Sequence, residues 1–239
     1  MMSISIDDIG ASRSIDEAAS VLANYDKISE WHVLVNGPSI ERVPSLDPGS
    51  AELCLHLTIT SGSPLSKYFP SELLNSNYTF KAPLQYNGAS LQQKISNYLT
   101  QLDVRHYSAI ASEFHAQMQR FICLFNRAPI NVSVHQDLDR LKWIQAAVLD
   151  ATGMKSRAKR ADDKESYSFE YKLFNENVRV QHVQSYIKKQ LTHSTTSMMS
   201  KAKELIVHPA TRVDDDLSDF TLYRKQRVIE YIALEQALS

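Results

Sequence analysis

The chain has 239 residues, of which 43% are hydrophobic and 22% charged, with a formal net charge of −1. This is the composition of a globular protein with a buried core, and the length suffices for one large domain or two small ones. The sequence predicts no membrane-spanning helix, because no apolar run approaches the roughly 18–20 residues that a span needs. Two cysteines exclude a disulfide framework, and 6 scattered glycines exclude a phosphate-binding loop or a dinucleotide fingerprint.

The first segment predicts a helix and a pair of strands. The start, MMSISIDDIG, carries two aspartates where a signal peptide would be basic and then apolar, so we expect a protein that is cytoplasmic or intravirion and not secreted. Ser14 and Glu17 form a capping box that predicts a helix. Trp31–Val35 is expected to be a strand, and Ser39–Val43 is expected to return beside it after the turn at Gly37.

The clearest strand pattern is ELCLHLTIT, residues Glu52–Thr60. Leucine and isoleucine occupy one face, whereas Cys54 and His56 share the other face, which we expect to be wetter. The stretch 61–89 is broken by Gly and Pro, with a short helix near Leu65–Leu74 and a strand at Tyr78–Phe80. Residues 1–89 are therefore predicted to form a mostly β region with one N-terminal helix and a small antiparallel sheet.

Helical periodicity dominates residues 90–153. A capping box at Ser90 opens a helical region that runs to about Asn126, and its apolar stripe changes phase between Leu102 and Tyr107. The capping pattern SVHQ at residues 133–136 predicts a further helix. Gly153 is expected at the C′ position, where this helix ends.

The C-terminal part is predicted to begin with an exposed basic linker, residues 154–165. Tyr167–Phe174 and Val178–Val183 then flank a three-residue turn and predict a β-hairpin. Helices are expected over 184–207 and from Asp214 to about Leu238. The expected fold is α+β, with the hairpin and these helices in a region 166–239 that forms either a separate domain or part of one domain overall.

Charge is distributed unevenly along the chain. Residues 1–60 hold 3 basic against 9 acidic side chains, whereas residues 151–203 hold 11 against 5. Such asymmetry suggests a polyanion partner or a polar association surface. The candidate nucleic-acid-binding residues are the cations of the basic segment and of the following helix: Lys155, Arg157, Lys159, Arg160, Lys188 and Lys189. A solvated loop and an anionic membrane surface are the alternatives.

The aromatic residues of the predicted hairpin allow two interpretations. Tyr167, Phe169 and Tyr171 share one face, where bases could stack on them in an RNA-binding protein. Leu173 lies on the same face, which is typical of a surface that packs on a core. We therefore favour a core role for these aromatics and leave only the cations free to bind a partner.

The histidines and cysteines offer one arrangement that could bind zinc. Cys54 and His56 point to the same side of their strand, and His32 could come near them. No further ligand has a spacing that completes the set, so we expect no metal, no cofactor and no catalytic residues. Cys123 lies in apolar FICLF, which suits a buried, unreactive thiol.

These patterns together predict a non-enzymatic binding or assembly protein that acts through its surfaces and that contacts RNA or another polyanion through the basic segment. One alternative is a viral or phage structural protein that self-associates. The other is a hydrolase or transferase whose site is built from dispersed residues. The expected partners are a polyanion or a second copy of the chain, without integral membrane association.

Overall fold

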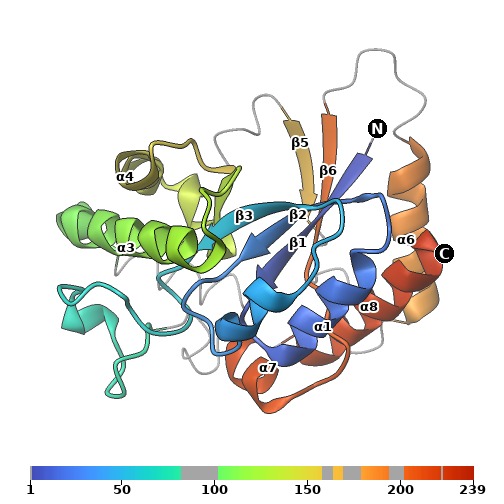
Figure 1. Cartoon of the computed structure of the whole chain (residues 1–239), viewed down its shortest axis with the longest axis horizontal. Coiled ribbons are helices and arrows are strands. Elements are labelled where there is room, and N and C mark those ends of the chain that lie inside the picture. Colours follow the sequence, from blue (N-terminus) through green and yellow to red (C-terminus); the bar gives the residue numbers. More distant parts are fainter. Residues whose placement is uncertain (1, 82–101, 158–163, 169–178, 194–201, 222) are drawn as a thin grey trace.

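The structure is a computed structural model (Figure 1) that describes residues 2–81, 102–157, 164–168, 179–193, 202–221 and 223–239. Within these ranges, none of the helices is long and apolar enough to cross a membrane.

A six-stranded sheet of parallel strands forms the centre of the molecule. The strands are β1 (Met2–Ile9), β2 (Ile28–Val33), β3 (Glu52–Leu57), β4 (Val132–Val134), β5 (Lys164–Ser168) and β6 (Ala202–Val207). Their order is β4-β3-β2-β1-β6-β5. This order runs around a circle from β1 to β6 with a break between β4 and β5, so the sheet resembles an opened (β/α) barrel.

The prediction of a small antiparallel sheet with a C-terminal hairpin is therefore wrong. Parallel strands need crossover connections rather than tight turns, and the segments between the strands supply them. Ser39–Val43, expected to be a returning strand, lies mostly in the 3₁₀ helix η1 (Ile40–Ser45). Strand β1, which lies at the centre of the order, was not predicted at all.

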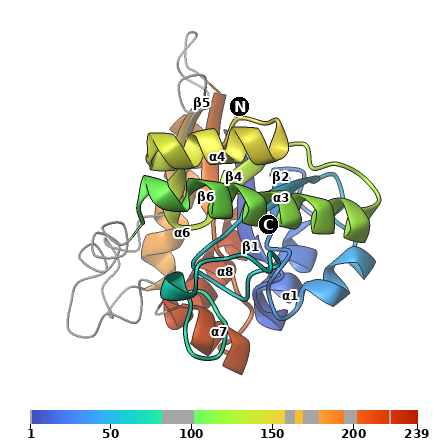
Figure 2. The ribbon, with the colours of Figure 1, turned by 90° about the vertical axis from the view of Figure 1, so that its left-hand side faces the viewer.

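Helices lie on either side of the sheet in the view of Figure 1. They are α1 (Arg13–Leu22), α3 (Tyr107–Phe125), α4 (Lys142–Thr152), α6 (Val180–His193), α7 (Asp215–Phe220) and α8 (Arg224–Leu238). Helices α3 and α4 pack side by side, and Figure 2 shows them crossing the molecule together. Helix α6 packs on α8, and α1 contacts α7.

Several helix predictions are confirmed. Helix α1 forms, although its capping side chain is Ser12 rather than Ser14. The change of phase after Leu102 marks a real boundary, since the 3₁₀ helix η4 (Val104–His106) precedes α3. Gly153 follows α4 with a φ of 71°, the left-handed conformation that favours glycine at a helix end.

Other helix predictions need correction. Only the 3₁₀ helix η2 (Ser71–Leu73) forms within the expected helix near Leu65–Leu74. The capping pattern at residues 133–136 instead spans the end of β4 and the start of the 3₁₀ helix η5 (His135–Arg140). The final predicted helix is two helices, α7 and α8, of which α7 is capped by Asp214.

The C-terminal hairpin is replaced by an α/β arrangement. Strand β5 pairs in parallel with β6, and Val180 begins α6 where a returning strand was expected. Residues 202–207, expected to be helical, form β6. Phe169 and Tyr171 of the predicted aromatic face lie outside the described residues.

The two faces of the sheet differ in chemistry. Apolar side chains on one face belong to the buried core, together with Phe114 and Phe121 of α3. The opposite face carries a row of buried polar side chains at alternating strand positions, which we call the polar face: Ser5, Asp7, Glu30, His32, Cys54, His56, Ser133 and Glu204. Parallel strands buried on both faces usually carry apolar runs, so this polar face marks a site.

Candidate metal centre and active site

The end of β1 carries two consecutive carboxylates that reach the same site. Consecutive strand residues normally point to opposite faces. Here Ile6 and Ile9 of β1 are three residues apart, whereas their partners on β2, Trp31 and Val33, are only two residues apart. Strand β1 therefore has one extra residue, which forms a bulge. Asp8 in this bulge has a φ of 69°. The extra residue and the left-handed backbone turn Asp8 toward the side that Asp7 also faces, as bulges beside active sites often do.

Asp8, His56 and His135 converge at the carboxyl ends of β1, β3 and β4. Asp8 Oδ1 lies 2.9 Å from His135 Nδ1 and 3.2 Å from His56 Nε2. The two ring nitrogens are 3.4 Å apart. All three side chains are buried. Active sites of (β/α) barrels lie at this edge of the sheet, so position and residue type agree.

These three atoms fit a metal ion. Ligands about 2.0–2.1 Å from a tetrahedral zinc ion lie about 3.3 Å from one another, close to the three separations in the cluster. Asp8 Oδ1 is buried and accepts no hydrogen bond of ordinary geometry, even though two imidazoles surround it. Buried carboxylate oxygens are almost always paired. A cation shared by the three atoms would account for both the convergence and the missing hydrogen bond.

The neighbouring carboxylate, Asp7, is held by a buried arginine. Arg157 Nη1 and Nη2 donate to Asp7 Oδ2 and Oδ1, both at 2.8 Å. Burial alone would raise the pKa of Asp7, but the charges of Arg157 and His56 outweigh it and hold that pKa below its ordinary value. Asp7 Oδ2 lies 3.8 Å from His56 Nε2, so an anionic carboxylate lies beside the cluster of Asp8, His56 and His135.

A second buried arginine supports Asp8 from helix α8. Arg227 Nη2 donates to Asp8 Oδ2 at 2.7 Å, and the guanidinium lies 5.4 Å from the ring centroid of Phe220. Phe220 also packs against the His135 ring, with the centroids 5.2 Å apart. Burial would raise the pKa of Asp8, but His135 and Arg227 hold it well below the ordinary value. Asp8 is therefore an anion that presents Oδ1 to the cluster.

A further group of possible ligands lies deeper on the polar face. Glu30 Oε2 accepts from His32 Nε2 at 2.8 Å and from the Cys54 thiol at 3.6 Å. Burial and the nearby Glu30 charge raise the pKa of Cys54. The thiolate that a metal requires is thus disfavoured, and these three residues act as a hydrogen-bonded group.

Of the three residues that the sequence offered as a zinc set, only His56 belongs to the cluster with Asp8 and His135. His32 and His56 do lie together, with ring centroids 6.1 Å apart. The other two members of the cluster come from elsewhere in the chain, Asp8 at the end of β1 and His135 directly after β4. The signal that could have found them is a polar residue at the carboxyl end of each strand, which becomes informative once the strands are known to be parallel.

The candidate nucleic-acid-binding residues do not form one surface. Arg157 is buried against Asp7, so it is not available to a phosphate. Ser156 beside it forms a parallel bridge with Val132, which shows that the predicted linker is packed at its start. Lys155 is exposed, as are Lys188 and Lys189 on α6. Lys159 and Arg160 lie outside the described residues.

Comparison with known proteins places the chain in a family. A family model described as YdjC-like protein matches residues 1–237. The chain belongs to the YdjC-like family. Comparison with curated protein sequences gives no match.

Two solved structures are similar to this YdjC-like chain. One is a protein from Enterococcus faecalis for which cellobiose-phosphate cleavage has been suggested; the two share 15% identity with a TM-score of 0.71, over 99% of this chain and 91% of that chain. The other is the polysaccharide deacetylase Bc1974 from Bacillus cereus, at 12% identity and a TM-score of 0.45, over 100% of this chain and 86% of that chain. The first supports the (β/α) barrel type of fold.

These findings overturn the functional prediction made from the sequence. A YdjC-like chain with a parallel α/β sheet is neither a viral structural protein nor an RNA-binding assembly protein. The enzyme alternative, a site built from dispersed residues, is the better one. The expectation of a non-enzyme failed because it relied on local motifs, whereas this site draws on β1, β3, β4 and α8.

Proposed function

We propose that this chain is a metal-dependent hydrolase that removes an acyl group from a carbohydrate. The observation that carries the proposal is the convergence of Asp8, His56 and His135 on one point, with the anionic Asp7 beside them. A carboxylate and two imidazoles are a common ligand set for zinc in hydrolases. A divalent cation held there would polarise the substrate carbonyl as a Lewis acid.

Hydrolysis at a carbonyl suits these residues better than cleavage of a glycosidic bond. Glycosidases generally use two carboxyl groups, one of which is protonated and acts as the acid. Asp7 and Asp8 each pair with an arginine, and the pKa of each lies below its ordinary value. Both are therefore ionised in the resting site at neutral pH, whereas a glycosidase acid must already carry a proton there.

The side chains around the cluster take distinct roles in this proposal. Asp7, an anion fixed by two hydrogen bonds from Arg157, accepts the proton of the attacking water and returns it to the nitrogen or oxygen that leaves the acyl carbon. Arg157 orients that carboxylate and keeps it ionised. Arg227 holds the second oxygen of Asp8, which directs Oδ1 toward the two imidazoles.

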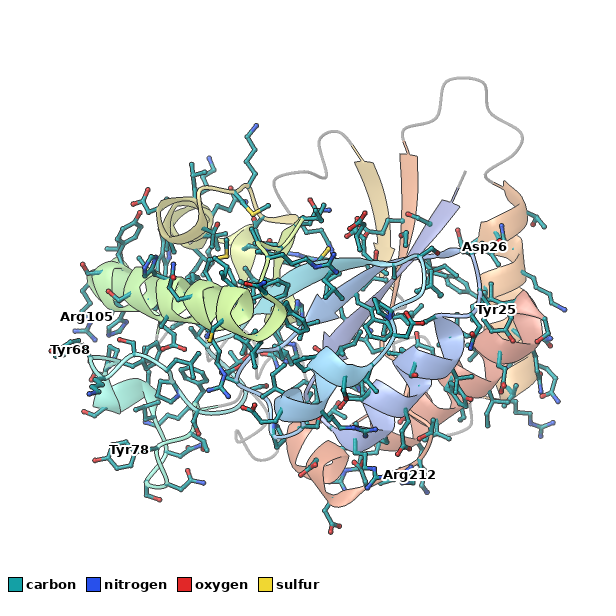
Figure 3. The ribbon with its side chains drawn as sticks, in the orientation of Figure 1. Tyr25, Asp26, Tyr68, Tyr78, Arg105 and Arg212 are labelled. Carbon is teal, nitrogen blue, oxygen red and sulfur yellow. The ribbon has the colours of Figure 1, made fainter. Side chains whose placement is uncertain are left out.

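The carbohydrate part of the proposal follows the suggested activity of the Enterococcus faecalis protein. The segment that leaves the carboxyl end of β3 offers a surface for such a substrate. A groove of about 360 Å³ there is lined by Leu65, Phe69 and Tyr78, among others. Tyr68 and Tyr78 are 86% and 74% exposed, and Figure 3 shows both at the outer edge of the molecule. Exposed aromatic rings can stack on the apolar faces of sugars.

Metal analysis and an acetate-release assay test this function together. We expect stoichiometric zinc, or another divalent transition metal, in the purified protein and acetate release from N-acetylated oligosaccharides. His135→Ala should lose the metal and the activity. His115→Ala, which removes an exposed histidine of α3, should keep both. Metal-free protein with unchanged acetate release would refute the proposal, as would a metal-loaded protein that releases no acyl group from any carbohydrate offered.

We also place the protein in the cytoplasm. Both Cys54 and Cys123 are free thiols, in keeping with a reducing compartment. Self-association, the remaining partner prediction, would be tested by the molar mass in solution from light scattering.

A further inference from the structure

A chain of buried hydrogen bonds leads from Glu30 to His56, a member of the candidate metal site. Glu30 Oε2 lies 2.8 Å from His32 Nε2, and His32 Nδ1 lies 2.7 Å from Ser133 Oγ. Ser133 Oγ in turn lies 2.6 Å from His56 Nδ1. His56 then presents its other nitrogen, Nε2, to Asp8. Strands β2, β3 and β4 thus contribute to one connected chain of polar groups.

The chemistry of its members gives this chain a direction. A carboxylate only accepts hydrogen bonds, and Glu30 accepts from Asn131 Nδ2 at 3.2 Å and from the Cys54 thiol as well as from His32. His32 Nε2 must therefore carry a proton. Burial lowers the pKa of His32, so its ring is neutral and Nδ1 is an acceptor.

The direction passes on through the serine. Ser133 has one hydroxyl proton, which goes to the acceptor Nδ1 of His32. Its oxygen must then accept from His56, so Nδ1 of His56 carries the proton in that 2.6 Å contact. Nε2 of His56 is left as the nitrogen whose lone pair can bind a metal.

We propose that Glu30, His32 and Ser133 form a positioning relay that holds a proton on His56 Nδ1 and so reserves His56 Nε2 for the metal. This inference rests on the proposed metal site and deepens it. Histidine ligands commonly donate their second N–H to a carboxylate or carbonyl. In this chain the carboxylate acts through two intermediates, so the tautomer of a ligand on β3 depends on a glutamate on β2.

The geometry of the strands explains why the relay works. His32 pairs with Cys54 in the β2–β3 register, and His56 pairs with Ser133 in the β3–β4 register. Paired residues of neighbouring strands share a face, so the side chains of His32, His56 and Ser133 lie together on one face of the sheet without any loop. Glu30, two residues before His32 on β2, lies on the same face. All members of the relay are buried, so water does not compete for the ring nitrogens.

Nuclear magnetic resonance of ¹⁵N-labelled histidine measures the protonation of each ring nitrogen directly. We expect His56 Nδ1 to be protonated both in metal-free protein and after Zn²⁺ is added, with the signal assigned by its loss in His56→Gln. In metal-free protein the His56 ring is either neutral with its proton on Nδ1 or doubly protonated. Nδ1 donates to Ser133 in both states, so its protonation decides the direction of the hydrogen bond even without metal. An unprotonated Nδ1 in wild-type protein would overturn the proposal.

Variants of the relay test its effect on the metal. Ser133→Ala should weaken Zn²⁺ binding about 10- to 100-fold, measured by competition with a chelator. Glu30→Gln offers an amide that can donate to His32, which permits the reverse direction, and should increase the fraction of metal-free His56 with an unprotonated Nδ1. Ser133→Thr keeps the hydroxyl and should restore affinity. Ser14→Ala removes an equally buried hydroxyl outside the relay and should leave affinity unchanged.

Each outcome bears on the relay separately from the proposed reaction. Unchanged affinity and an unchanged His56 signal in Ser133→Ala would refute the relay, even if the enzyme is active. Loss of affinity in Ser133→Ala with recovery in Ser133→Thr would support it, even if no acyl substrate is found. If wild-type protein binds no Zn²⁺, the proposed function fails, and the protonation of Nδ1 still decides the hydrogen-bond direction.

Discussion

Replacing Arg157 by methionine tests whether this arginine is a buried structural partner of Asp7 or a surface cation. The variant leaves the Asp7 carboxylate buried without its two hydrogen bonds from the guanidinium. Removal of one member of a buried ion pair typically costs about 3–5 kcal/mol of unfolding free energy. We expect a loss in this range at pH 7, measured by urea denaturation of metal-free protein so that bound metal does not contribute.

The chain offers a matched control for this variant. Arg140 Nη2 donates to Asp137 Oδ2 at 2.8 Å, the same distance as in the buried pair, but both side chains are largely exposed. Exposed pairs contribute about 0–1 kcal/mol, so Arg140→Met should change stability little. If both variants lose the same small amount, Arg157 is not a buried partner and the description of the site at Asp7 is wrong.

The effect of Arg157→Met should depend on pH. The lowered pKa of Asp7 in the folded wild type contributes stability that is present above the unfolded value of 3.8 and lost as the pH falls below it. In the variant, burial without Arg157 favours protonated Asp7, so the penalty is relieved as the pH falls. The difference between wild type and variant should therefore be largest near pH 7 and shrink toward pH 4. A difference that grows on acidification would contradict this explanation.

Three further predictions follow from the same structure. Burial raises the pKa of Asp16 from 3.8 to about 6, so on going from pH 4 to pH 7.5 the wild type should lose about 2.4 kcal/mol more stability than Asp16→Asn, with most of the loss below pH 6; parallel stability curves would disprove it. Zn²⁺ at 100 times its Kd should stabilise the wild type by about 2.7 kcal/mol in denaturation experiments but should not stabilise His135→Ala. Tyr78→Ala should raise KM for an oligosaccharide without changing kcat, while Tyr25→Ala, at the far end of the molecule (Figure 3), should change neither.

Local patterns predicted the helices better than the sheet. Helices α3 and α4 follow apolar stripes and end signals that lie within single segments, such as Gly153 after α4. Sheet topology depends on which strands pair, and no local pattern records that. Strand β2 and the hairpin-like turn near Gly37 suggested an antiparallel partner, whereas the chain continues into η1 and reaches β3 by a crossover.

The polar side of the strand ELCLHL shows why the site was missed. Alternation correctly placed Cys54 and His56 on the face opposite the leucines. The alternation predicts that this face is the wetter one, but it is the buried interior of a curled parallel sheet, and both residues are almost fully buried. The alternation therefore identified the face, and only the parallel order of the strands showed that Asp7, Glu30 and Ser133 share it.

The pair of aspartates after β1 illustrates how backbone and chemistry combine at this site. A regular strand could offer only one of Asp7 and Asp8 to the polar face, so it could supply either a metal ligand or a base but not both. The bulge and the φ of 69° at Asp8 remove that restriction. Each carboxylate then receives its own arginine, Arg157 for Asp7 and Arg227 for Asp8. Two adjacent anions are thereby kept ionised and separate, as required by the roles proposed above, in which Asp8 binds the cation and Asp7 takes a proton.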